Sequence, residues 1–90
     1  MKTITVLTIS FAPITEAPTQ DNTKLHKTIY FASLNKAITA IEKTVGTITN
    51  EERFVLITGN KYSGAVNMQY KDTLMNKRVV FFAKRFPVRN

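Results

Sequence analysis

The sequence predicts an α+β domain: a four- or five-stranded, mostly antiparallel sheet with one α-helix packed on one face. Three observations predict this fold class. One segment has apolar residues at helical spacing, five others alternate or run apolar over the length of a strand, and turn residues separate most of them. Ninety residues are enough for one domain, residues 1–90, with the element order β-β-α-β-β-β.

The first expected strand, residues 3–11, changes the parity of its apolar positions once. These positions are Ile4, Val6, Leu7, Ile9 and Phe11. Because successive side chains of a strand alternate, the first two share one face and the last three share the other. Either both faces of this strand are buried, or a bulge near Val6 and Leu7 turns all five side chains inward.

A long exposed loop is expected over residues 12–27, which contain Pro13, Pro18 and several polar residues. The chain's one histidine, His26, belongs to this segment. Its nearest carboxylates in the sequence are Glu16 and Asp21, too few partners for a metal site or a general base. We therefore expect His26 to be a solvated loop residue.

A short strand is expected at residues 28–32, with Ile29 and Phe31 on one face and Tyr30 on the other. It leads directly into Ser33, whose hydroxyl can accept a hydrogen bond from a free amide of a first helical turn. The strand and the helix cap are therefore expected to be contiguous.

The predicted helix follows Ser33, because apolar residues recur there at three- and four-residue steps. They are Leu34, Ala37, Ile38, Ile41 and Val45. Gly46 suits the left-handed conformation that often closes a helix. Beyond it, the pattern Thr49-x-x-Glu52 resembles a capping box that begins one further helical turn.

Three more strands are expected in the second half of the chain. Residues 54–58 are continuously apolar and rich in β-branched side chains, which is typical of a central strand. Glycines bound residues 59–64, which predicts a hairpin loop with Lys61 and Tyr62 at its tip. Residues 65–71 alternate, and a turn at residues 71–76 leads to a last strand at residues 77–86.

The last strand is expected to present two different faces. Val79, Phe81 and Ala83 form an uncharged face that should meet the helix. The reverse face carries Arg78, Val80, Phe82, Lys84 and Phe86. One helix covers only one face of such a sheet, so Phe82 and Phe86 need another explanation. The 12–27 loop covers them, a second subunit buries them, or they stack on a ligand.

Positive charge is concentrated in the same region. The chain has a formal net charge of +7, and residues 71–90 hold six cations and one carboxylate, or +5 of that total. Such a charge favours acidic partners: nucleic acid, an anionic membrane surface or an acidic protein. The chain has no cysteine, which agrees with a cytoplasmic protein, and no apolar run approaches the ~18 residues of a membrane span.

The sequence contains no recognisable catalytic set. One histidine, no cysteine and six scattered carboxylates give no pair suited to acid–base chemistry. We therefore expect a non-enzymatic protein without a cofactor or a metal site. Its Lys-, Asn-, Thr- and Ile-rich composition resembles that of small accessory proteins of AT-rich genomes, including those of phages.

Two functional hypotheses follow from the charge and the rings. In the first, a small basic module binds nucleic acid by Coulomb attraction and by stacking of bases on aromatic rings. In the second, an inhibitor or adaptor docks its basic face on a larger nucleic-acid-processing machine. Homodimerisation is expected with either. The expected contact residues are Tyr30, Lys61, Tyr62, Lys71, Lys77, Arg78, Phe82, Lys84, Arg85 and Phe86.

Overall fold

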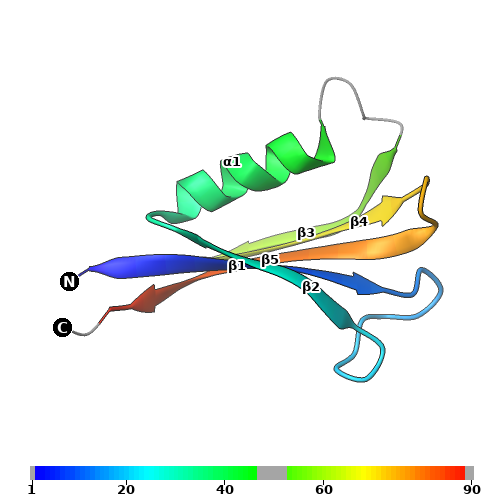
Figure 1. Cartoon of the computed structure of the whole chain (residues 1–90), viewed down its shortest axis with the longest axis horizontal. Coiled ribbons are helices and arrows are strands. Elements are labelled where there is room, and N and C mark those ends of the chain that lie inside the picture. The colour runs from blue at the N-terminus through cyan, green and yellow to red at the C-terminus, as the bar shows by residue number, and fades with distance from the viewer. Residues whose placement is uncertain (1, 47–52, 89–90) are drawn as a thin grey trace.

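This computed structural model describes residues 2–46 and 53–88, within which the chain forms five antiparallel strands and one helix (Figure 1). Along the chain they are β1 (Thr3–Ala12), β2 (Lys24–Phe31), α1 (Leu34–Val45), β3 (Phe54–Tyr62), β4 (Ala65–Asp72) and β5 (Lys77–Pro87). Across the sheet the strand order is β2-β1-β5-β4-β3. The predicted α+β fold, with its order β-β-α-β-β-β, is confirmed. The predicted capping box at Thr49 and Glu52 lies outside the described residues.

Helix α1 begins and ends where the sequence predicts. The hydroxyl of Ser33 accepts a hydrogen bond from the amide of Lys36 at 3.2 Å, which satisfies one of the free donors of the first turn. At the other end Gly46 adopts a left-handed conformation, with φ of 64°, and its amide donates to the carbonyl of Lys43.

The core lies between α1 and one face of the sheet, which we call the helix face. Its buried residues are Leu7, Ile9, Ala37, Ile41, Val45, Val79, Phe81 and Ala83. Phe81 has no exposed surface and lies on β5, the central strand of the sheet. The prediction that Val79, Phe81 and Ala83 face the helix is therefore confirmed. Burying each large side chain of this kind is worth about 1.5–3 kcal/mol.

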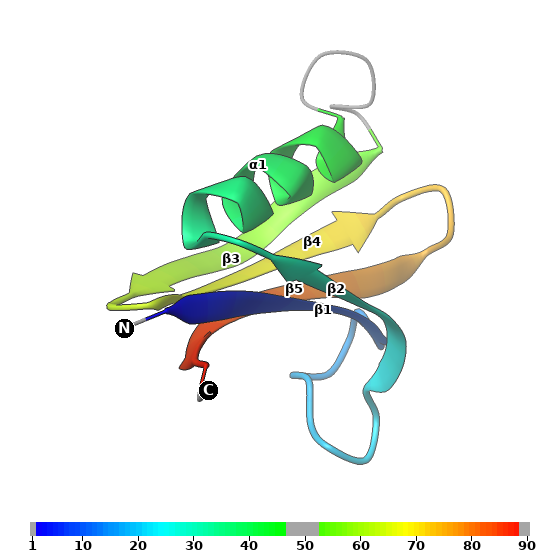
Figure 2. The ribbon, with the colours of Figure 1, turned by 60° about the vertical axis from the view of Figure 1, so that its left-hand side comes forward.

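The opposite face of the sheet, which we call the open face, turns away from α1 (Figure 2). The pairing of β1 with β5 runs without a shift from Thr3 to Ala12, so no bulge occurs at Val6 and Leu7. Ile4 and Val6 accordingly lie on the open face, where they are half-buried. The bulge is therefore not observed, and the other alternative, burial of both faces, holds only in part because the open face of β1 is half-buried at Ile4 and Val6.

The loop between β1 and β2 is shorter than the expected 12–27 segment. Residues 24–27 join β2, because Lys24, Leu25 and Lys27 pair with the end of β1. A shift in this pairing leaves His26 as the extra residue, and its ring lies 4.7 Å from the ring of Phe11. His26 is exposed, but it belongs to a strand rather than to the loop.

Strand β3 is an edge strand, so the prediction of a central strand for residues 54–58 was wrong. Its apolar run is largely solvent-exposed: Val55, Leu56 and Ile57 retain 51%, 54% and 42% of their surface. The strand also extends to Tyr62, which leaves only Ser63 and Gly64 as the turn and corrects the expected 59–64 loop. A continuous apolar run does not distinguish a strand with two neighbours from one with a single neighbour.

Candidate nucleic-acid interface

The open face carries a row of paired residues that crosses all five strands. Reading across the sheet, the row is Tyr30, Val6, Lys84, Ala65 and Tyr62. With strands about 4.8 Å apart, the row spans roughly 19 Å. A tyrosine stands at each edge of the sheet, and a lysine stands at its centre.

Two phenylalanines flank that central lysine on β5. Phe82 and Phe86 retain 37% and 42% of their surface, and Tyr30 retains 65%. The Lys84 ammonium lies 5.3 Å from the centroid of the Phe86 ring, within the range of a cation–π contact. We call Tyr30, Tyr62, Phe82, Lys84 and Phe86 the basic–aromatic patch.

Uncharged polar groups lie beside Phe82 in this patch. Phe82 pairs with Thr8 on one side and with Asn67 on the other, and the row continues to Thr28 and Asn60. The Thr8 hydroxyl donates to the carbonyl of Phe82 at 3.4 Å. Among the described residues, the strand positions of the open face include no aspartate or glutamate. No carboxylate on these strands therefore neutralises Lys84.

Arg78 lies on the same face of the same strand, but it is buried, with 9% of its surface exposed. Its Nε donates to the carbonyl of Pro13, and its Nη2 donates to the carbonyls of Ile14 and Glu16, at 2.9–3.1 Å. Its Nη1 donates to Oε1 of Gln69 at 3.0 Å. Arg78 thus holds the β1–β2 loop against the sheet and is not available to a partner.

The position of the β1–β2 loop rules out one of the three explanations for the exposed rings, which is that this loop covers them. The loop follows β1 on the side of the sheet opposite α1 (Figure 2), where Arg78 binds its backbone. Phe82 and Phe86 remain exposed beyond it. Within the described chain, loop coverage therefore fails for these two rings, and a ligand or a second subunit remains.

The structure divides the ten expected contact residues into three groups. The basic–aromatic patch and the half-buried Lys71 lie on the open face, together with the buried Arg78. Lys61, Lys77 and Arg85 have the parity of the helix face. The Lys77 ammonium lies 4.3 Å from the Phe11 ring centroid, and the Arg85 guanidinium packs over Gly64. These three cations are therefore separate from the patch.

Three residues next to the patch were not among the expected contacts. Ile4 pairs with Phe86, Val6 pairs with Lys84, and Thr8 pairs with Phe82. The signal that could have found them is the parity change in the first strand, which puts Ile4 and Val6 on the face opposite the core. Without the pairing register, that signal did not connect them to β5.

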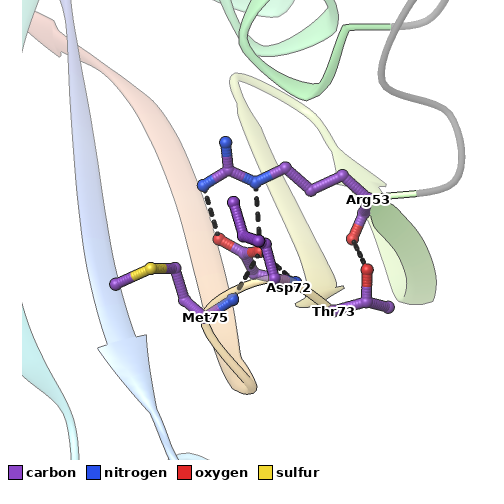
Figure 3. A network of polar contacts seen from close by, with 5 residues as sticks. Arg53, Asp72, Thr73 and Met75 are labelled. Carbon is purple, nitrogen blue, oxygen red and sulfur yellow. Dashed lines mark hydrogen bonds and ion pairs between the residues drawn. The ribbon is translucent and has the colours of Figure 1, made fainter.

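A second polar network lies on the helix face where β3 begins and β4 ends (Figure 3). Nε and Nη2 of Arg53 donate to the two carboxylate oxygens of Asp72, both at 3.1 Å, and the amides of Leu74 and Met75 donate to Oδ1. Burial opposes ionisation of Asp72, but these hydrogen bonds and the charge of Arg53 outweigh it and lower the pKa of Asp72. The network joins the β4–β5 turn to the start of β3.

Comparison with known proteins supplies no relative: no protein-family model, curated protein or solved structure matches the chain. Within residues 2–46 and 53–88, no three His, Cys, Asp or Glu side chains are grouped so as to hold a metal ion. No described helix is both long enough and apolar enough to cross a membrane. A function for this chain therefore has to be inferred from the geometry of the open face.

Proposed function

We propose that the protein is a non-enzymatic module that binds single-stranded nucleic acid on its open face. The observation that carries the proposal is the basic–aromatic patch, in which exposed rings flank Lys84 on a sheet face whose strands hold no described carboxylate. Stacking of a base on an aromatic side chain is worth about 1–3 kcal/mol, and a positively charged surface attracts the phosphates.

Single strands fit this surface better than duplexes do. Rings that lie on a broad sheet can stack only on bases that are unpaired and splayed out. The amides of Asn67 and Asn60 and the hydroxyls of Thr8 and Thr28 add hydrogen-bonding groups that suit base edges or the sugar–phosphate backbone. The expected binding mode is therefore stacking on Phe82, Phe86 and Tyr30, with phosphates near Lys84.

Fluorescence anisotropy with a labelled oligonucleotide of about 12 nucleotides, within the usual site sizes of single-strand binders, tests the proposal. We expect binding at micromolar protein, with an affinity that falls linearly with salt on logarithmic axes and exceeds that for the matching duplex. Phe82→Leu keeps an apolar side chain but removes the ring, and Lys36→Gln on the exposed surface of α1 serves as control. Absence of salt-sensitive binding by the wild-type protein refutes the proposal.

A protein partner is the second candidate function, and the edge strand β3 favours it. The outer side of β3 has no neighbour in the described sheet, and the side chains of Val55, Leu56 and Ile57 on this strand are exposed. A partner strand could pair with such an edge, as a second copy or as part of a larger nucleic-acid-processing assembly to which this chain is an inhibitor or adaptor.

Two measurements distinguish this second function from the first. A pull-down with and without nuclease should retain one defined protein when the partner is a protein, and Leu56→Lys should release it. Sedimentation at several concentrations should detect a dimer when the partner is a second copy. Recovery of nucleic acid alone by a monomeric protein would rule out the second candidate.

A further inference from the structure

The helix face contains a pocket of about 480 Å³ beyond the covered core, on the side of the sheet opposite the basic–aromatic patch. It lies between Thr44 near the end of α1 and the adjoining ends of β1, β2, β3 and β5. Its apolar surface includes the core residues Ile9, Val79 and Phe81 and the partly buried rings of Phe11 and Phe54. Its size and apolar lining are typical of small-molecule sites, which measure roughly 300–1,000 Å³.

Cations border this apolar surface. The Lys77 ammonium lies 4.3 Å from the Phe11 ring centroid, and the Arg53 guanidinium carbon lies 5.0 Å from the Phe54 ring centroid. Lys27 also lines the pocket, as does His26. Three full positive charges therefore surround a space bounded by hydrocarbon.

The negative charge at the pocket is already neutralised. Asp72 is the one carboxylate among the described lining residues, and it is nearly buried, with 4% of its side chain exposed. Arg53 binds both of its oxygens, and two backbone amides of the β4–β5 turn donate to it (Figure 3). Lys27 and Lys77 are left to attract an anion from solution.

We propose that this pocket binds an amphipathic anion, a small molecule with an alkyl or aryl body and one carboxylate. The body would contact Ile9, Val79 and the two rings, and the carboxylate would lie between Lys27 and Lys77. A neutral hydrocarbon leaves those two cations without a partner, whereas a small inorganic anion such as phosphate has no apolar part to place against the rings. The site is distinct from the proposed nucleic-acid surface and does not depend on it.

Displacement of the fluorescent probe anilinonaphthalene sulfonate, itself an amphipathic anion, tests this proposal in the folded protein. We expect decanoate to displace the probe and decanol to do so at least about tenfold less well, since loss of a charge-assisted contact costs that much or more. Lys77→Gln should weaken decanoate binding by a similar factor, whereas Lys36→Gln, at an exposed helix position outside the pocket, should not.

A second variant keeps the test decisive if the probe also binds elsewhere on the protein. Thr44 is exposed at the border of the pocket, so Thr44→Trp should narrow the site while leaving every cation in place. This substitution should weaken decanoate binding at least as much as Lys77→Gln does, with an unchanged circular dichroism spectrum. Equal displacement by decanol and decanoate, or full binding by Thr44→Trp, would overturn the proposal.

Discussion

Arg78 and Lys84 are two cations on the same face of β5, yet their surroundings are opposite. Arg78 is buried and donates hydrogen bonds to three carbonyls of the β1–β2 loop, whereas Lys84 is exposed among aromatic rings. The difference comes from the loop, which lies over one end of the strand and leaves the other end free. Alternation along a strand assigns a side chain to a face, but neighbouring segments decide whether it is structural or available to a partner.

The largest expected effect is the difference between Arg78 and Lys84 in their contribution to the free energy of unfolding. Arg78→Met removes several hydrogen bonds from a charged donor, each worth about 1.5–3 kcal/mol, although the freed loop carbonyls regain water. We expect the free energy of unfolding to fall by about 2–3 kcal/mol. The matched variant Lys84→Met should change it by no more than about 0.5 kcal/mol, as is usual at an exposed site. Urea denaturation measures both, and equal losses would show that the comparison is mistaken.

The next effect concerns the ring beside Lys84. Phe82→Leu should weaken oligonucleotide binding roughly tenfold or more, because one stacked base contributes about 1–3 kcal/mol. Its thermal stability should change little, since Phe82 is partly exposed on the open face. Leu74→Ala, an apolar truncation in the exposed β4–β5 turn, is the control. Similar losses of affinity in both variants would argue against stacking on Phe82.

A smaller effect should appear in the salt dependence. For single strands the logarithmic slope of affinity against salt is about −0.7 for each neutralised phosphate. Lys84→Gln should therefore reduce the magnitude of the slope by about 0.7, whereas Lys36→Gln should leave it unchanged. Anisotropy titrations over a series of salt concentrations measure the slope. An unaltered slope for Lys84→Gln would mean that Lys84 does not contact phosphate.

The smallest expected effect concerns Asp72, whose hydrogen-bonded carboxylate should contribute to the free energy of unfolding in a pH-dependent way. The pKa of Asp72 is lowered in the folded protein, so its contribution to stability is present above the unfolded pKa of about 3.9 and is lost as the pH falls through the folded value. Asp72→Asn should be less stable than wild type at pH 7, and the two should converge under strongly acidic conditions. Thermal melts across this range measure the difference, and a constant gap would contradict the assignment.

Much of the fold follows from local patterns in the sequence. Ser33, Gly46 and the apolar spacing between them predict α1 because capping and helical periodicity are local properties. The two faces of β5 follow in the same way from alternation. The position of β3 at the edge of the sheet does not, because strand order depends on pairing between distant segments. The extension of β2 to Lys24 also depends on pairing, here with β1.

The sequence likewise predicts part of the candidate site, namely the sheet face on which each residue lies, but not the contacts that depend on distant segments. Alternation correctly put Tyr30, Phe82 and Lys84 on one surface, since it needs only the parity of each strand. It could not show that Arg78 would bind the carbonyls of Pro13 and Ile14, which depends on the path of the loop. The pocket on the helix face was missed for a related reason. The sequence predicts a loop for His26 and Lys27, and no local pattern in it indicates that they belong to β2, beside the end of β1.

Chemical-shift mapping by nuclear magnetic resonance tests the central claim most directly. In ¹H–¹⁵N spectra of the protein titrated with a single-stranded oligonucleotide, we predict that the largest shifts occur at the amides of Thr8, Tyr30, Phe82, Lys84 and Phe86. Amides on the exposed side of α1, such as those of Lys36 and Lys43, should not move. Shifts centred on α1, or no shifts at saturating oligonucleotide, would contradict the assignment of the open face as the binding surface.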